Sequence, residues 1–129
     1  MSTPVPLRVL VADDSSLLRR LLRDAIEEVE GVEVVAEAAD GVTAVAEARK
    51  HAPGVVVLDL QMPVVNGLSA LPMLLDRPTR PCVIMLTNHS DEAYRAACLA
   101  AGADHFFDKS SEFDRVLDVL RQLAVRAEA

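Results

Sequence analysis

The sequence has 129 residues, of which 51% are hydrophobic and 26% charged, and its formal net charge is −7 at pH 7. This length and apolar content favour one domain around one core and exclude a mainly disordered chain. The negative charge argues against direct nucleic-acid binding, which depends on Lys and Arg that neutralise phosphates. No apolar run approaches the length of a membrane span, and the first six residues, MSTPVP, lack the apolar core of a signal peptide. We therefore expect a cytoplasmic protein without membrane binding, with a flexible tail at residues 1–6 and one domain at 7–129.

The first half of the chain alternates strand-like with helix-like segments. Apolar runs at residues 7–12, 32–38 and 55–58 have the length and the Val content of buried strands. Residues 16–30 and 41–51, which lie between these runs, carry apolar side chains at helical spacing. The candidate N-caps are Ser15 or Ser16 for the first helix and Asp40 for the second.

The second half continues the same alternation. A third helix follows Gly67, where an N-cap at Ser69 would place Pro72 within the first turn and so predicts a late start. Ser111 is the expected N-cap of the last helix. The remaining elements are a strand at 82–87, a helix at 91–102, a strand at 103–109 and the last helix.

Five such strand–helix units predict an α/β fold. Strands that are apolar almost throughout are typical of a parallel sheet covered by helices on both faces. Right-handed crossovers then allow a doubly wound, flavodoxin-like sheet with the strand order 2-1-3-4-5.

Polar side chains follow the strands where each strand ends. In a parallel sheet these ends share one edge, and sites form in the crevice where the winding reverses, which here lies between strands one and three. The polar residues at four strand ends are therefore expected to converge on one pocket: Asp13-Asp14, Asp59, Thr87 and Asp108-Lys109.

The residue types in this pocket favour one kind of chemistry. Three carboxylates repel one another unless a divalent cation and Lys109 compensate their charge. Oxygen ligands without His or Cys favour Mg²⁺. A carboxylate nucleophile beside Mg²⁺, an ammonium and a hydroxyl suits phosphoryl transfer, with an aspartyl phosphate formed at Asp59.

At these residues the chain strongly resembles the receiver domain of bacterial two-component response regulators, including the stand-alone chemotaxis type, over Leu7 to about Ala127. The resemblance rests on the acidic pair, the string DLQMPVVNG that begins at Asp59, the hydroxyl of Thr87 and the lysine Lys109. It implies a signalling phosphoprotein of a phosphorelay, which catalyses its own phosphorylation and dephosphorylation and is otherwise not an enzyme.

The resemblance also implies the role of each site residue. Asp14, Asp59 and the backbone carbonyl of Gln61 would bind Mg²⁺ directly, and Asp13 would act through water. Asp59 would accept a phosphoryl group from the phosphohistidine of a sensor histidine kinase or a phosphotransfer protein.

A switch is implied as well. Thr87 would move to the phosphoryl group and Phe106, the aromatic residue three before the lysine, would turn inward. This movement would reshape the face made by the fourth helix, fifth strand and fifth helix for an output protein of unknown identity, or for a phosphorylation-dependent homodimer.

The chain departs from the family at several positions. Ser110 replaces the proline that usually follows the lysine, and because a cis bond before a non-proline residue costs about 2.5–4 kcal/mol, the Lys109–Ser110 bond is expected to be trans. Asn88 is larger than the small residue usual after the threonine. Gln61 and His89 occupy positions that tune the lifetime of the phosphoryl group in the family.

Two other functions fit the sequence less well. A haloacid-dehalogenase-like phosphatase also uses an Asp nucleophile and Mg²⁺, but it needs a second Asp where this chain has Gln61. A flavodoxin-type flavin binder would place a phosphate against DDSS at residues 13–16, whose two carboxylates repel it. The last helix is expected to run to the end of the sequence, which leaves open a stand-alone receiver or a part of a longer regulator.

Overall fold

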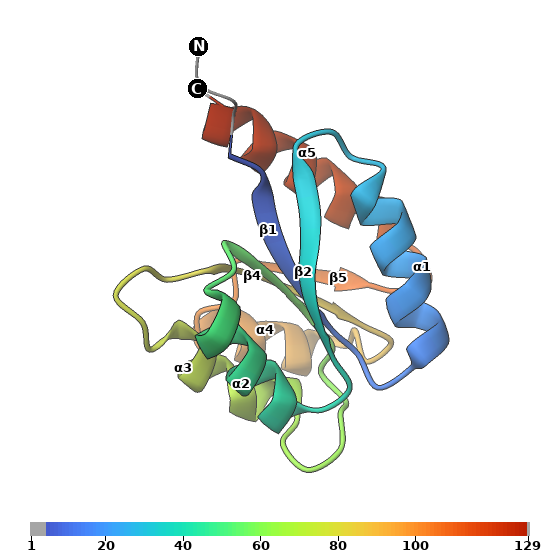
Figure 1. Cartoon of the computed structure of the whole chain (residues 1–129). Helices are drawn as coiled ribbons and strands as arrows, with labels where there is room; N and C mark the ends of the chain where they lie inside the picture. The colour runs from blue at the N-terminus through green and yellow to red at the C-terminus, as the bar shows by residue number, and fades with distance from the viewer. Residues whose placement is uncertain (1–4, 129) are drawn as a thin grey trace.

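Strands and helices alternate strictly along the chain in the computed structural model, which describes residues 5–128 (Figure 1). Most of the expected tail, residues 1–4, lies outside the described residues. The strands are β1 (Leu7–Ala12), β2 (Val32–Ala38), β3 (Val55–Leu58), β4 (Cys82–Thr87) and β5 (His105–Asp108). The helices are α1 (Ser16–Glu27), α2 (Gly41–His51), α3 (Gly67–Leu75), α4 (Glu92–Ala100) and α5 (Phe113–Glu128).

The five strands form one parallel sheet in the order β2-β1-β3-β4-β5, which confirms the predicted topology. The register aligns the strand ends. Ala12 of β1 lies opposite Leu58 of β3, so that the residues after both strands leave the same edge. Thr87 of β4 pairs with Asp108 of β5, which brings the last two strand ends together as well.

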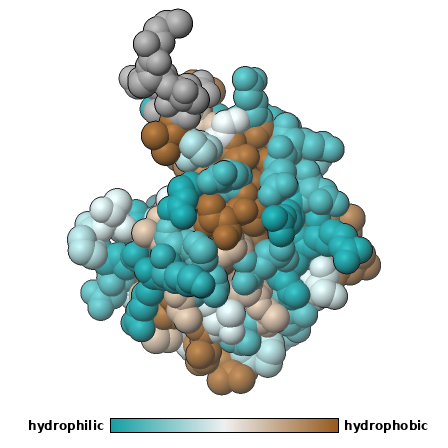
Figure 2. Space-filling model, in the orientation of Figure 1, coloured by the Kyte–Doolittle hydropathy of each residue, from teal (hydrophilic) through white to brown (hydrophobic). Residues whose placement is uncertain are grey.

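Helices cover both faces of the sheet (Figure 1). On one face α1 and α5 pack on the strand residues that include Val9 and Val57. On the other face α2, α3 and α4 pack on the alternate strand residues, such as Leu10 and Leu58. The outer surfaces of α1 and α2 are mostly hydrophilic, whereas hydrophobic side chains show between them over the β1–β2 edge (Figure 2). Among the described residues no helix combines the length and apolarity that crossing a membrane requires.

The helix starts confirm two of the predicted caps and correct two others. Ser15 caps α1 and Asp40 caps α2, as predicted. The late start of α3 is wrong, because Asn66 caps the helix through the Ser69 N–H (2.8 Å) and Gly67 is its first residue. Pro72 therefore lies inside the helix, on its exposed side.

The predicted cap of α5 is also wrong. Ser111 lies in the turn before the helix and donates its backbone N–H to Asp108 Oδ1 at 3.2 Å. The helix starts at Phe113, after Glu112, whose carbonyl accepts the Arg115 N–H at 3.0 Å. The Asp108 carboxylate binds the N–H groups of Ser110 and Ser111 and so holds both residues in the turn that precedes the helix.

The end of α2 carries a residue in the left-handed region, Ala52, with φ 47° and ψ 57°. A Cβ destabilises this conformation and glycine tolerates it, so Ala52→Gly is expected to raise the free energy of unfolding by about 1 kcal/mol. Urea denaturation measures the change. In the exposed interior of α4, Ala96→Gly is the control and should lower stability by about 1 kcal/mol. A loss of stability in both variants would contradict the prediction.

Candidate functional site

The end of β1 holds one carboxylate inside the protein and one outside. Asp13 is 1% exposed, and Asp14 is exposed. The backbone of Asp13 is fixed on both sides, since its N–H donates to the Ala38 carbonyl (2.9 Å) and its own carbonyl accepts from an Arg19 Nη (2.6 Å). Its Oδ1 accepts the Ser15 N–H at 2.8 Å. The second oxygen is left to face the site.

The end of β3 places a second carboxylate beside the first. Asp59 is 5% exposed and donates its backbone N–H to the Ala12 carbonyl at 2.9 Å. The loop that follows turns back at once, with the Gly67 N–H bonded to the Leu60 carbonyl at 2.8 Å. A Cβ on Gly67 would lie 2.1 Å from the Asp59 carbonyl oxygen. The last residue of the DLQMPVVNG string therefore has to be glycine.

Lys109 crosses from the end of β5 to both buried carboxylates. Its backbone N–H donates to the Thr87 carbonyl at 3.0 Å. Its Nζ lies 2.5 Å from Asp13 Oδ2 and 2.9 Å from Asp59 Oδ2, with only 11% of the side chain exposed. The ammonium thus links the ends of β3 and β5, since Asp59 and Lys109 are 50 residues apart in the sequence.

Burial and the neighbouring charges shift the pKa values of Asp59 and Lys109. Burial raises the pKa of Asp59, and the nearby Asp13 adds to the rise, while the contact with Lys109 only partly opposes it. Burial lowers the pKa of Lys109, but the hydrogen bonds to Asp13 and Asp59 outweigh that effect and leave the pKa above its usual value. Contact with one ammonium thus does not fully offset the cost of burying the Asp59 carboxylate.

The remaining negative charge suits a small cation. Asp13, Asp14 and Asp59 each offer an oxygen, and these oxygens lie within 4.8 Å of one another. Opposite ligands of Mg²⁺, each at about 2.0–2.1 Å, are separated by about 4.2 Å. The residues thus fit a hydrated Mg²⁺ with small side-chain adjustments or with one carboxylate acting through water.

These groups open into a cavity of about 270 Å³ at the carboxyl edge of the sheet. Its walls are Asp13, Asp14, Ser15, Leu18, Asp59, Gln61, Asn88, His89 and Lys109. The sequence-predicted catalytic, metal and tuning residues meet here, apart from Thr87. That residue is fully buried, and its hydroxyl accepts the His89 N–H at 3.0 Å.

The predicted switch residue Phe106 lies in the core. The residue is 4% exposed and packs with the cluster beneath α2, α3 and α4. The inward position that the resemblance assigns to the phosphorylated form is thus already occupied in this structure.

Asp108 does not join the pocket, against expectation. Its carboxylate accepts hydrogen bonds from Ser90, Ser110 and Ser111 instead. The hydroxyl of Ser110, followed by that of Ser90, holds the pKa of Asp108 well below its usual value. A signal for part of this was present in the sequence, because an Asp often binds the backbone two residues further on. Nothing in the sequence indicated that Arg19 binds the Asp13 carbonyl.

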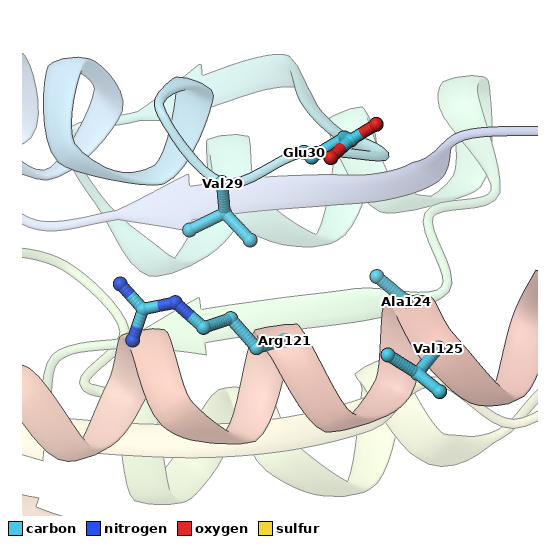
Figure 3. Close-up of a pocket in the computed structure, with 5 residues that line it drawn as sticks. All are labelled: Val29, Glu30, Arg121, Ala124 and Val125. Carbon is cyan, nitrogen blue, oxygen red and sulfur yellow. The ribbon is translucent and has the colours of Figure 1, made fainter.

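A larger cavity, of about 340 Å³, lies at the other end of the molecule, between the segment after α1 and the end of α5 (Figure 3). Its walls are Val29, Glu30, Arg121, Ala124 and Val125. Arg121 is engaged within its own helix by Asp118 at 3.0 Å. Size alone therefore does not mark the reactive site, since this cavity offers no clustered carboxylates and no buried lysine.

Comparison with known proteins agrees with this geometry. Residues 9–121 match the family model of the response regulator receiver domain. The chain is 31% identical to the chemotaxis protein CheY of Bacillus subtilis, covering 89% of this chain and 95% of that protein. It is 38% identical to protein-glutamate methylesterase/protein-glutamine glutaminase 5 of Myxococcus xanthus, covering 84% of this chain but only 32% of that protein.

Solved structures give the same result. The response regulator domain of Thermotoga maritima CheB matches with a TM-score of 0.81 at 33% identity, covering 95% of this chain and 96% of that domain. A CheX–CheY–BeF3–Mg²⁺ complex from Borrelia burgdorferi matches with a TM-score of 0.82 at 30% identity, covering 95% of this chain and 90% of that chain.

These matches support neither the phosphatase nor the flavin-binding alternative. The chain spans about a third of the length of the methylesterase relatives and nearly all of the length of CheY. The family-model match over residues 9–121 includes the acidic pair, Asp59 and Lys109. By its sequence, its fold and the geometry of this site, the chain belongs to the response regulator receiver domain family.

Proposed function

We propose that Asp59 accepts a phosphoryl group from the phosphohistidine of a sensor histidine kinase or a phosphotransfer protein. The observation that carries this proposal is the position of Lys109 Nζ, which contacts Asp13 and Asp59 together beside the exposed Asp14. Such an arrangement leaves negative charge for a cation and keeps an ammonium beside the attacking carboxylate.

The proposed reaction moves one phosphoryl group. An Asp59 oxygen attacks phosphorus, the bond from phosphorus to the imidazole nitrogen breaks, and its electron pair stays on the imidazole. Asp59 Oδ2 is held by Lys109, whereas Oδ1 has only a long contact with the Gln61 N–H at 3.4 Å and is the less restrained oxygen. Lys109 lies where it can neutralise the transferred oxygens.

Mg²⁺ is part of the proposal. Asp14, Asp59 and the Gln61 carbonyl would hold the ion directly, and Asp13 would do so through water. When bound, the ion neutralises charge on the phosphoryl oxygens. The donor set supports this assignment, because it consists of oxygens alone.

The signal is proposed to leave through α4, β5 and α5. The Thr87 hydroxyl accepts the His89 N–H and still has its own hydrogen for a phosphoryl oxygen. Phosphorylation then favours the arrangement in which Thr87 reaches the phosphoryl group and Phe106 stays inward. Of the α4 residues only Cys98 is buried, so this helix can shift to present a surface to an output protein or to a second copy of the chain.

Intact mass measurement after incubation with Mg²⁺ and acetyl phosphate tests the proposed function. We expect one added phosphoryl group that hydroxylamine removes, and no addition in Asp59→Ala. Addition that persists in Asp59→Ala would overturn the assignment, and so would a wild-type chain that gains no mass. Light scattering of the phosphorylated and unphosphorylated protein tests the homodimer.

Mg²⁺ is expected to stabilise the fold. A ligand at 100 times its Kd that binds only the native state adds about 2.7 kcal/mol to the free energy of unfolding. Urea denaturation with Mg²⁺, against NaCl of equal ionic strength, measures this gain. Asp14→Asn should lose most of it, and Asp118→Asn, an exposed change on α5, should keep it. Equal gains in both variants would place the ion elsewhere.

The lifetime of the phosphoryl group is proposed to depend on Gln61 and His89, which line the cavity. Truncation of either side chain admits water to Asp59, so Gln61→Ala and His89→Ala should lose the phosphoryl group several-fold faster. Decay of the phosphorylated mass after removal of the donor gives the rate. His51→Ala, at the end of α2, serves as control. Decay rates equal to the wild-type rate in both variants would refute the role.

A further inference from the structure

The turn that carries Lys109 is built without the family's proline. The described peptide bonds are all trans, that between Lys109 and Ser110 included. The Asp108 carboxylate closes this turn. Its Oδ1 accepts the Ser110 N–H at 2.8 Å, the Ser110 hydroxyl at 2.5 Å and the Ser111 N–H at 3.2 Å. One side-chain oxygen thus binds three donors from the two residues after Lys109.

The other oxygen of Asp108 reaches a second loop. Its Oδ2 accepts a hydrogen bond from the hydroxyl of Ser90, in the loop between β4 and α4. This loop also carries Asn88 and His89, which line the cavity that holds Asp59. Asp108 therefore links two of the loops that form the pocket, although it does not line the pocket itself.

The backbone of Asp108 is fixed as firmly as its side chain. Its N–H donates to Glu112 Oε1 at 3.1 Å, and its carbonyl accepts the Glu112 N–H at 2.8 Å. The next residue, Lys109, is held by the Thr87 carbonyl and has its ammonium inserted between two carboxylates. With both neighbours of Lys109 restrained, the start of its side chain has a defined direction.

We propose that Asp108 is a positioning residue for phosphoryl transfer: it fixes the trans turn from which Lys109 reaches the pocket and ties that turn to the β4–α4 loop through Ser90. This role rests on the proposed function of Asp59. If Asp108 has this role, a receiver without a proline after the lysine needs an acidic or amide side chain directly before the lysine. A misplacement of about 1 Å in such a site costs up to about 100-fold in rate.

Phosphorylation by acetyl phosphate, followed by intact mass over a range of donor concentrations, tests the role. The variants are Asp108→Ala, Asp108→Asn and Ser90→Ala. The control is Asp118→Ala, which removes an exposed aspartate whose carboxylate accepts a hydrogen bond from Arg121 of the same helix. Mg²⁺ affinity is measured for each by calorimetry, and folding by urea denaturation.

Asp108→Ala is expected to lower the maximal phosphorylation rate about tenfold, with Mg²⁺ affinity within twofold of the wild-type value. Asp108→Asn should recover most of the rate, because its amide oxygen still accepts the turn N–H groups. Ser90→Ala should cost about threefold, since only the link to the β4–α4 loop is lost. A general loss of structure would lower Mg²⁺ affinity as well and would not be rescued by asparagine.

The outcomes separate the two proposals. A wild-type chain that gains no phosphoryl group overturns the function of Asp59, and the role of Asp108 with it. A wild-type chain that is phosphorylated at the same rate as folded Asp108→Ala overturns the role of Asp108 alone. If Asp108→Ala does not fold, Ser90→Ala decides, and an unchanged rate in that exposed variant overturns the role.

Discussion

Gly67→Ala is expected to lower the free energy of unfolding by about 3 kcal/mol or more. The added Cβ would lie 2.1 Å from the Asp59 carbonyl oxygen and 3.1 Å from the Leu60 Cα. Both atoms belong to the backbone, so no side-chain rotation relieves the clash. Either β3 or the start of α3 has to move, and the hydrogen bond between the Gly67 N–H and the Leu60 carbonyl is strained with it.

The same displacement reaches the reactive group. Asp59 owes its position to the β3 backbone that the new methyl group would push, so phosphorylation by acetyl phosphate should slow in Gly67→Ala even where the protein still folds. Gly54→Ala is the matched control. Its Cβ would meet Leu7 Cδ1 at 3.6 Å and the Arg8 carbonyl oxygen at 3.8 Å, which are ordinary contacts. Urea denaturation should show Gly54→Ala close to wild type, and equal losses in the two variants would contradict the steric argument.

The fold was predictable from the sequence because its signal repeats. Five apolar runs alternate with five amphipathic segments, and only a parallel sheet covered on both faces buries such a pattern. The site followed from the same regularity. Once the strands are parallel, the residues after β1, β3 and β5 have to leave one edge, and Asp13, Asp59 and Lys109 meet there without any need for side-chain detail.

Two helix starts were not predictable, since more than one neighbouring polar residue is a candidate cap for each helix. For α3 the side chain of Asn66 binds the Ser69 N–H, which sets the start early and leaves Pro72 inside the helix. For α5 the carboxylate of Asp108 binds the Ser110 and Ser111 N–H groups, which holds Ser111 in the turn, and the helix begins at Phe113. Sequence patterns give the candidates for such a cap, and three-dimensional contacts decide between them.

The partners of Asp108 and the burial of Phe106 depend on contacts between segments far apart in the chain. Ser90 and Asp108 are separated by 18 residues and meet because β4 and β5 are neighbours in register. Alternation in β5 sends the two adjacent rings to opposite faces of the sheet. Phe106 is buried beneath α2, α3 and α4, and Phe107 is partly buried against the cluster beneath α1 and α5.

Lys109→Met is expected to lower the phosphorylation rate by about 10² to 10³, the usual cost of removing one group that stabilises charge in the transition state. Methionine keeps much of the lysine's length and apolar volume but removes the ammonium that contacts Asp13 and Asp59 at 2.5 and 2.9 Å. Only one other lysine is present, Lys50, which is exposed on α2. Lys50→Met is therefore the control and should phosphorylate at the wild-type rate.

The same variant also changes how stability depends on pH. Burial already places the pKa of Asp59 in the native state above its value in the unfolded state. Between these two pKa values the native state holds a proton that the unfolded state has released. Stability therefore falls as the pH rises through this interval. Without the ammonium the pKa of Asp59 rises further, so this fall extends to higher pH. At pH 7 we expect a loss of about 2 kcal/mol, less than for a pair in a closed core because the cavity admits water. Urea denaturation at pH 5 and pH 7 measures it, and a loss that is equal at both values or larger at pH 5 would show that Lys109 does not compensate the charge of Asp59.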